Sequence, residues 1–395
     1  MDRRSVYRKE RLDTNVNIAL LGHGTVGRGV DEICAKLEGV DVTRILELPD
    51  RLTDERMTSD FQDIVDDQEI SLVLECMGGL EPAHTFISDA LAAGKSVVTS
   101  NKAVVAHYLQ EFVDLARTTG SQLICEAAVG GGVPWLSSIR QVRRIDAISS
   151  ISGIMNGTTN FILDAMHKGD ADFAETLAEA QRLGYAERDP SADIDGIDVA
   201  NKVVISTLAA FDALTSVEQI PVTGIRHFTK TDEDTFKAHG RTVKLIGRAV
   251  REGDRFACAV EPVAMPDFTV EASIPGNFNI LSLDAETVGP LKFYGQGAGS
   301  LPTGNAMVQD VLDYREGKRP TFTINPDLTW DPTLLVGDYV IRTTADLPVD
   351  GKVYGANARL VEGINAEEAC ALLTTARTMD PEAIIFARPL KALFQ

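Results

Sequence analysis

Residues 16–27, VNIALLGHGTVG, decide the fold of the first part of the chain. Residues 16–21 form an apolar run with β-branched side chains, which is typical of a buried strand. A GxGxxG motif follows at once, with its glycines at Gly22, Gly24 and Gly27. Strand, glycine-rich turn and helix in direct succession are typical of a dinucleotide-binding unit.

Each position of the turn has a physical role in such a unit. Gly22 permits the tight turn, Gly24 lets a pyrophosphate approach the backbone, and Gly27 lets the helix pack against the strand. Thr25 and Val26 open the helix, whose free N–H groups are expected to face the phosphates. The alternative is a glycine-rich turn without a ligand.

The end of the second predicted strand, residues 42–46, bears on the choice of cofactor. Glu47 follows that strand about 20 residues past the motif, where an acid usually contacts the adenosine ribose and favours NAD over NADP. Arg44 and Arg51 flank it, and either is a candidate ligand for a 2′-phosphate. A solvated strand end is the other interpretation of Glu47.

Further short strands at residues 71–76, 96–99 and 122–126, separated by helical patterns, predict a doubly wound parallel sheet. Ligands of such sheets bind at the carboxyl ends of the strands. The segments at these strand ends contain glycine, polar and charged residues. The residues of interest in them are Met77, Gly78, Ser100, Lys102 and Glu126. Lys102 is either a solvated surface residue or a side chain directed into the crevice, and its place between strand and helix favours the crevice.

A glycine run follows Glu126, at residues 130–132. Its carbonyl groups and the nearby carboxylate are oxygen ligands of the kind that suit a hard cation. A hinge between domains explains the same run equally well.

The second half of the chain predicts an antiparallel or mixed sheet covered by helices. Strands are expected at 147–153, 243–250, 256–263, 279–283 and 286–293, and helices at 158–166, 173–183 and 198–211. Residues 185–198 are expected to be a polar loop. Asp198 and Lys202 stand four residues apart on one helix face. They are either a surface ion pair or a carboxylate and an amine that project into a cleft.

Glycines at 295–299 open a helix at 302–316, whose N-terminus has the form of an anion site. We expect this helix to complete the first domain. The predicted class is thus α/β, with a Rossmann-type domain at 1–134, a central α+β catalytic and dimerisation domain at 135–319 and a small C-terminal α/β appendage at 320–395.

Composition narrows the classes of partner and the cellular location that we expect for the protein. The 395-residue chain has a formal charge of −20, which argues against nucleic acids and anionic membranes as partners because both are polyanions. The five cysteines are scattered without CxxC spacing, which predicts reduced thiols and a cytoplasmic location. The charged start of the chain has no apolar segment of the kind found in signal peptides.

Seven segments, in this order, resemble homoserine dehydrogenase. They are GHGTVG at 22, MGGLEP at 77, SNKAVVA at 100, EAAVGGGVP at 126, GIMNGTTNFIL at 153, GYAERDPSADIDGIDVANK at 184 and GQGAGSLPTGNA at 295. The resemblance covers about residues 16–316.

The resemblance implies NAD- or NADP-linked interconversion of homoserine and aspartate 4-semialdehyde, a step toward threonine and methionine. By position in the shared motifs, Lys202 lies closest to the reacting oxygen and Lys102 lies beside nicotinamide and substrate. Glu187 and Asp198 bind the substrate amino group. The remaining pocket residues implied are Asp193, Tyr185, Thr158 and Gly157.

The cofactor-binding residues implied by the motifs are Gly22, Gly24, Thr25, Val26, Gly27, Glu47, Met77, Gly78, Ser100, Lys102 and Gly299. The family's cation site implies a structural monovalent ion such as sodium, held by Glu126, Val129, Gly131 and Val133. A homodimer or homotetramer is also implied.

Two features depart from the family pattern. The C-terminal segment at 320–395, called the tail below, lacks a DxPGxLA-like sequence of a regulatory ACT module. Whether threonine inhibits the protein is therefore left open. Glu47 stands where many relatives have a basic residue, which leaves the cofactor open. The rival functions are a semialdehyde dehydrogenase with Cys125 as nucleophile, and a nucleotide-binding regulator without catalysis.

Overall fold

The computed structural model describes residues 15–389. Their contacts divide into two units. The first holds the chain up to Asn101 together with 110–127 and 299–321, and the second holds 102–109, 128–298 and the rest from Phe322. The division falls inside helix α4 (Lys102–Thr119), next to Tyr108, whose backbone departs from helical geometry.

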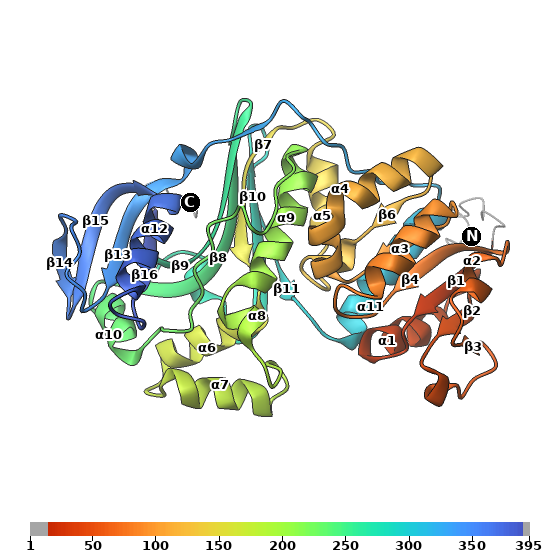
Figure 1. Ribbon diagram of the computed structural model, residues 1–395, viewed down its shortest axis with the longest axis horizontal. Helices are drawn as coiled ribbons and strands as arrows, with labels where there is room; N and C mark the ends of the chain where they lie inside the picture. The colour runs from red at the N-terminus through yellow and green to blue at the C-terminus, as the bar shows by residue number, and fades with distance from the viewer. Residues whose placement is uncertain (1–14, 390–395) are drawn as a thin grey trace, which may run out of the picture. The chain divides into compact units, whose positions relative to one another are not determined.

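The first unit is built on a parallel sheet with strand order β3-β2-β1-β4-β5-β6 (Figure 1). Its strands are β1 (Val16–Leu21), β2 (Val40–Leu46), β3 (Met57–Thr58), β4 (Ile70–Glu75), β5 (Ser96–Thr99) and β6 (Leu123–Ile124). Its helices are α1 (Thr25–Cys34), α2 (Gln62–Val65), α3 (Ala83–Ala92), α11 (Ser300–Arg315) and the later part of α4. Strand order reverses beside β1, where doubly wound sheets bind ligands.

Helix α11 returns to this first unit from far along the chain and packs beside α1. The Ser300 hydroxyl donates a hydrogen bond to the Thr25 carbonyl at 2.6 Å. Apolar residues of α11, such as Met307 and Val311, join the core formed by Ile18 and Leu20 of β1. The Rossmann-type fold is therefore confirmed, with α11 in the same unit.

The second unit contains a mixed sheet with the order β11-β10-β7-β8-β9-β16-β13-β15-β14, and β12 pairs with β9. Its strands are β7 (Ile148–Ile154), β8 (Arg241–Glu252), β9 (Arg255–Pro266), β10 (Phe278–Ala285), β11 (Gly289–Gln296), β12 (Thr329–Trp330), β13 (Val336–Arg342), β14 (Lys352–Gly355), β15 (Ala358–Asn365) and β16 (Ile384–Pro389). Its helices are α5 (Trp135–Val142), α6 (Gly157–Lys168), α7 (Phe173–Arg182), α8 (Ser191–Ile194), α9 (Ile197–Phe211), α10 (Lys230–Ala238) and α12 (Ala366–Arg377).

Helices α6 and α9 pack against the β7–β8 part of this sheet (Figure 1). Helix α9 is buried along nearly its whole length, which explains its almost continuous apolar sequence. The expectation that 185–198 form a loop is wrong for residues 191–194. They form the short helix α8, because Pro190 precedes them and fits the start of a helix.

The C-terminal strands continue the central sheet instead of forming one of their own. Strand β16 lies beside β9 with Ala387 opposite Val263, and β13, β15 and β14 follow outward. A single apolar core includes Val263 and Tyr339 from the two regions. Burial of shared apolar surface therefore joins the tail to the rest of the second unit.

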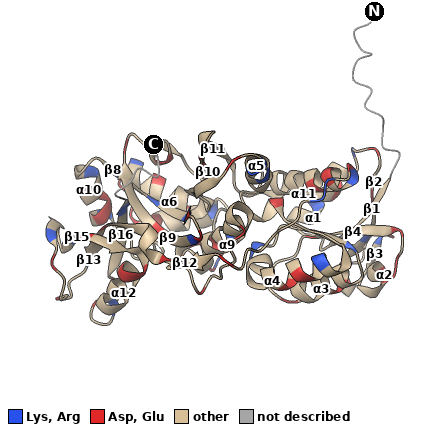
Figure 2. Ribbon diagram, turned by 90° about the horizontal axis from the view of Figure 1, so that it is seen from above, with Lys and Arg blue, Asp and Glu red and all other residues tan. Residues whose placement is uncertain are grey.

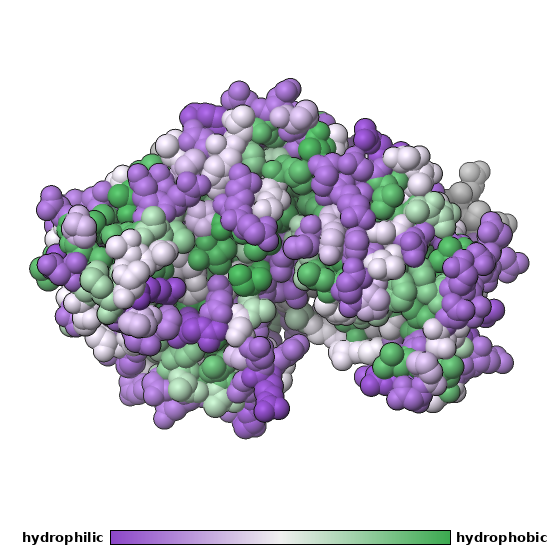
Figure 3. Space-filling model, viewed as in Figure 1, coloured by the Kyte–Doolittle hydropathy of each residue, from purple (hydrophilic) through white to green (hydrophobic). Residues whose placement is uncertain are grey.

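Acidic residues are spread over the ribbon, including the first turns of α10 and α12 (Figure 2). The face shown in Figure 3 is largely hydrophilic, with small hydrophobic patches between. Among the described residues, no helix combines the length and the apolar character that crossing a membrane demands.

Candidate functional site

The glycine-rich loop of the first unit has the geometry of a phosphate-binding turn. Gly22 adopts a φ of 91°, a region that side chains disfavour. A Cβ at Gly27 would lie 2.2 Å from the Gly22 carbonyl oxygen, so only glycine fits there. Nothing lies within 4 Å of the corresponding point at Gly24. Helix α1 begins at Thr25, next to Val26, and its N-terminal amides open onto this space.

Glu47 lies beside this loop at the end of β2. Its carboxylate accepts hydrogen bonds from the His23 amide at 3.0 Å and from the Leu48 amide at 3.1 Å, one on each oxygen. The His23 amide bond is the main reason why the pKa of Glu47 is lowered. Each oxygen has a second lone pair, so Glu47 still has acceptor capacity for two hydroxyl groups.

The loops after β4 and β5 are joined by a buried carboxyl group that sequence reasoning missed. Glu75, the last residue of β4, accepts hydrogen bonds from the Met77 amide at 2.6 Å and from the Thr99 hydroxyl. Burial raises the pKa of Glu75 to about 7. Asn101 adds a hydrogen bond to the Gly79 carbonyl at 2.8 Å. Glu75 thus fixes the segments that contain Met77, Gly78 and Ser100. In the sequence, the feature that could have pointed to Glu75 is an acidic residue at the end of an otherwise apolar strand.

In the second unit, one carboxylate holds both predicted lysines. The Lys102 Nζ lies 2.9 Å from Asp198 Oδ1, and the Lys202 Nζ lies 2.7 Å from Asp198 Oδ2. The side chain of Lys202 is 8% exposed and that of Lys102 is 40% exposed. Lys202 also donates to the Met155 carbonyl at 2.6 Å. An ammonium has three donors, so one N–H of Lys202 remains for another acceptor.

These contacts set the protonation of the three groups. Burial lowers the pKa of Lys202, and the charge of Lys102 lowers it further against the opposing effect of Asp198. The charge of Asp198 raises the pKa of Lys102. Burial opposes ionisation of Asp198, but the two lysine charges outweigh it and hold its pKa below the usual value. One lysine is therefore tuned toward losing its proton and the other toward keeping it.

Asn156 orients this cluster, a role that the sequence did not predict. Its Oδ1 caps α6 by accepting from the Thr159 amide at 2.8 Å. Its Nδ2 donates to Asp198 at 2.9 Å and to Asp193 at 2.6 Å. Since one amide bridges both carboxylates, the start of α6 is fixed against the start of α9.

Comparison with known proteins gives the family. Residues 134–312 match the family model described as homoserine dehydrogenase, and residues 22–126 match the homoserine dehydrogenase NAD binding domain. A homoserine dehydrogenase of Synechocystis is 39% identical over 75% of this chain and 73% of its own length. One from Corynebacterium glutamicum is 38% identical over 91% of this chain and 85% of its own length. The chain belongs to the homoserine dehydrogenase family.

Solved structures agree with this assignment. A homoserine dehydrogenase from Thiobacillus denitrificans has a TM-score of 0.82 at 30% identity and covers 95% of this chain and 98% of its own. A hyperthermophilic archaeal homoserine dehydrogenase in complex with NADPH has a TM-score of 0.68 at 27% identity, covering 78% and 100%. The family comprises oxidoreductases that act on CH–OH groups, and its NAD-binding domain indicates a nicotinamide cofactor for this chain.

Other predicted substrate residues lie near Lys102 and Lys202. Asp193 is half-buried, and burial raises its pKa. Glu187 is exposed, and its charge contributes to the raised pKa of Lys102. The Thr158 hydroxyl donates to the Tyr185 carbonyl at 2.6 Å, next to Gly157 at the start of α6. The structure therefore brings carboxylates from α8, α9 and one loop, and the Thr158 hydroxyl from α6, near the two lysines.

The predicted cation ligands are divided between the two units. Glu126 is buried in the first unit, where its amide donates to Asp310 at 3.1 Å. Val129, Gly131 and Val133 lie in the second unit. The Val133 carbonyl already accepts from the Trp135 amide at 2.8 Å. Among the described residues, no group of three or more His, Cys, Asp or Glu side chains is arranged to hold a metal ion, so such a site depends on backbone oxygens.

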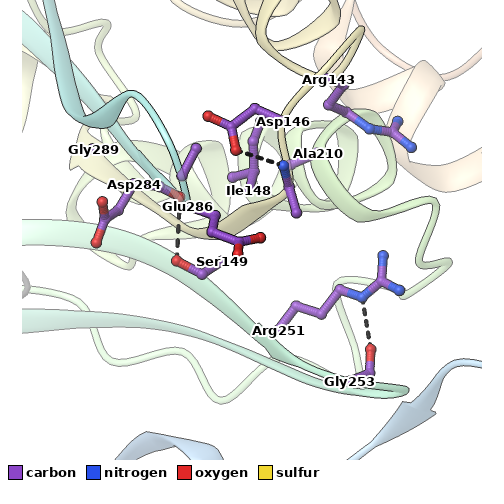
Figure 4. Close-up of a pocket in the computed structure, with 12 residues that line it drawn as sticks. Arg143, Asp146, Ile148, Ser149, Ala210, Arg251, Gly253, Asp284, Glu286 and Gly289 are labelled. Carbon is purple, nitrogen blue, oxygen red and sulfur yellow. Dashed lines mark hydrogen bonds between the residues drawn. The ribbon is translucent and has the colours of Figure 1, made fainter.

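Two further features lie apart from this cluster. Cys125, the nucleophile of the rival thiol mechanism, is 1% exposed. A separate cavity in the second unit is lined by charged residues at the end of α5 and near the ends of strands (Figure 4): Arg143, Asp146, Arg251, Asp284 and Glu286. Its arginines hold local structure, since Arg143 pairs with Asp212 and Arg251 donates to the Gly253 carbonyl at 2.9 Å. No predicted site residue lines this cavity.

Proposed function

We propose that this chain catalyses the reversible oxidation of L-homoserine to L-aspartate 4-semialdehyde with NAD as the preferred cofactor. Membership of the family supports the reaction. The main observation behind the proposed chemistry is that Asp198 forms ion pairs with both Lys102 and Lys202. This arrangement supplies a proton acceptor and a fixed cation within a single cluster.

The bound nicotinamide supplies the hydride chemistry. Lys202, in its neutral form, accepts the hydroxyl proton of homoserine, and its lowered pKa favours that form. Lys102 remains charged and stabilises the negative charge that develops on the same oxygen. In the reverse direction the ammonium of Lys202 returns the proton to the aldehyde oxygen.

The substrate's own charges need partners as well. Both oxygens of Asp198 face lysines, so in this proposal Asp198 acts mainly as their counter-ion. Glu187 and Asp193 are then the anions for the substrate ammonium group. Tyr185, Thr158 and Gly157 complete the pocket, as the motifs imply.

NAD is favoured by the environment of Glu47. Two amides fix its carboxylate, and the remaining lone pairs suit the two ribose hydroxyls. Gly22, Gly24, Thr25, Val26, Gly27, Met77, Gly78, Ser100, Lys102 and Gly299 are the other proposed contacts. Gly299 is the N-cap residue of α11.

The proposal also includes a structural monovalent cation, a homo-oligomeric assembly and a cytoplasmic location. The Val129 and Gly131 carbonyls accept no hydrogen bond among the described residues, and such oxygens suit a hard ion like sodium. Glu126 and Val133 are the other ligands that the shared motif implies for this ion. The ion takes no part in the chemistry proposed here.

The test is initial-rate kinetics with L-homoserine and each nucleotide, with and without threonine, followed at the nicotinamide absorbance band. We expect turnover with a higher kcat/KM for NAD. Nucleotide binding without any turnover would show a regulator instead. Activity lost on mild thiol alkylation would favour the Cys125 mechanism, whereas alkylation should spare a lysine-based site. Light scattering of the same preparation gives the oligomeric state.

A further inference from the structure

Arg56, just before β3, is held by two carboxylates at once. Its Nη1 and Nη2 donate to Asp31 at 2.9 and 3.0 Å. Its Nε and Nη2 donate to Asp54 at 3.1 and 2.7 Å. Asp54 also accepts from the Arg56 backbone amide at 2.9 Å, which fixes this aspartate beside the arginine.

These bonds occupy both edges of the guanidinium. Arginine recognises phosphate through a pair of parallel N–H bonds, either from the Nη1/Nη2 edge or from the Nε/Nη2 edge. Asp31 takes the first edge and Asp54 takes the second. Arg56 therefore has no free edge for a phosphate, although its side chain is 31% exposed.

The clamped arginine is connected to the proposed ribose position. Asp31 also bonds the His23 Nε2 at 3.1 Å. The amide of His23 in turn donates to Glu47. Arg56, Asp31, His23 and Glu47 thus form a continuous hydrogen-bonded chain at the end of β2, where a 2′-phosphate would be placed.

We propose that Asp31 and Asp54 set the preference for NAD over NADP by withholding Arg56 from the 2′-phosphate. The inference rests on the proposed function and on Glu47 as the ribose ligand. Asp31 and Asp54 outnumber the guanidinium that they clamp, so the clamped arginine has no net positive charge to offer a phosphate group. Removal of one carboxylate frees one edge of the guanidinium.

Two other arginines lie near the same strand end. Arg44 donates from Nη1 to the Thr43 carbonyl at 3.2 Å. Arg51 is exposed, and its charge lowers the pKa of Glu47. Because either one offers a rival explanation for NADP binding, the experiment must show that any gain depends on Arg56.

The test compares the full-length protein with D54A, D54A/R56Q and D50A. Asp54 is chosen because its side-chain bonds go to Arg56, whereas Asp31 also supports His23. Asp50 is an exposed acid in the same connection (Pro49–Arg51), so D50A removes an equal charge and leaves the clamp intact. The readout is the ratio of the Kd values for NADH and NADPH from nicotinamide fluorescence.

We expect D54A to shift this ratio toward NADPH by about tenfold, as one charge-assisted phosphate contact warrants. D50A should shift it little, and D54A/R56Q should return it to the wild-type value. An unchanged ratio in D54A, an equal shift in D50A, or a gain that survives in D54A/R56Q would overturn the proposal. Binding does not require homoserine turnover, so failure here is distinguishable from failure of the proposed reaction.

Discussion

Replacement of Lys202 by methionine tests the proposed chemistry most directly. Methionine keeps the length and apolar stem of the side chain but removes the nitrogen that bonds Asp198 and Met155. The third position of the Lys202 nitrogen, a lone pair in the neutral amine and an N–H in the ammonium, is the proposed contact to the reacting oxygen. The variant therefore deletes the proton acceptor while it preserves most of the packing in α9.

The expected loss follows from the role of this one nitrogen. General acid–base catalysis contributes about 100- to 10,000-fold to a rate. This corresponds to about 3 to 5 kcal/mol in activation free energy. The loss should appear mainly in kcat, because nucleotide binding is assigned to the loop after β1 and to Glu47.

The fold should survive this change. Asp198 keeps Lys102 at 2.9 Å and the Asn156 amide at 2.9 Å, so the buried carboxylate is not left without partners. The destabilisation should then stay below the roughly 3 to 5 kcal/mol found when a buried ion pair loses its only partner. Urea unfolding measures this value.

The assay is the initial rate of homoserine oxidation, with NADH affinity measured in parallel. Lys36 provides a matched control, since it forms an i, i+4 pair with Glu32 at 2.9 Å but is 69% exposed. K36M should retain the wild-type rate because such surface pairs contribute little. If K202M keeps a rate within a few-fold of wild type while it binds NADH normally, Lys202 is not the proton acceptor.

Three further outcomes are expected. K102M should lower kcat for homoserine oxidation. It should also move the ascending limb of the pH profile to higher pH, because loss of a nearby cation raises the pKa of Lys202. A limb that stays in place argues against electrostatic coupling between Lys102 and Lys202. Glu75 has a folded pKa of about 7 against 4.5 for the free side chain, so stability is lost as pH rises through this interval. Relative to wild type, E75Q should gain up to about 3 kcal/mol between pH 5 and pH 8 in urea unfolding, and parallel curves would contradict this. N156A should destabilise the protein by about 2 to 4 kcal/mol, since it removes a helix cap and a buried donor to Asp198, and should raise the KM for homoserine; an unchanged KM would leave Asn156 with a structural role alone.

Local order in the chain was sufficient to predict much of the first unit. A strand, three spaced glycines and a helix follow each other directly, so their geometry depends on neighbouring residues and needs no long-range information. The alternation of short apolar runs with helical patterns predicted the parallel sheet for the same reason. The i, i+4 spacing likewise placed Asp198 and Lys202 on one face of α9.

Tertiary structure decided which of these residues act together. Lys102 and Lys202 are 100 positions apart, and only folding shows that both bind Asp198. The bridge from Asn156 to two carboxylates, the buried Glu75 and the clamp on Arg56 also join separate elements. The sequence predicted the tail as a separate appendage, whereas its strands extend the central sheet. Strand pairing at a sheet edge and a shared core depend on long-range contacts, which sequence patterns do not record. Sequence patterns record periodicity along one element, whereas burial, charge pairing and protonation depend on what other elements bring alongside.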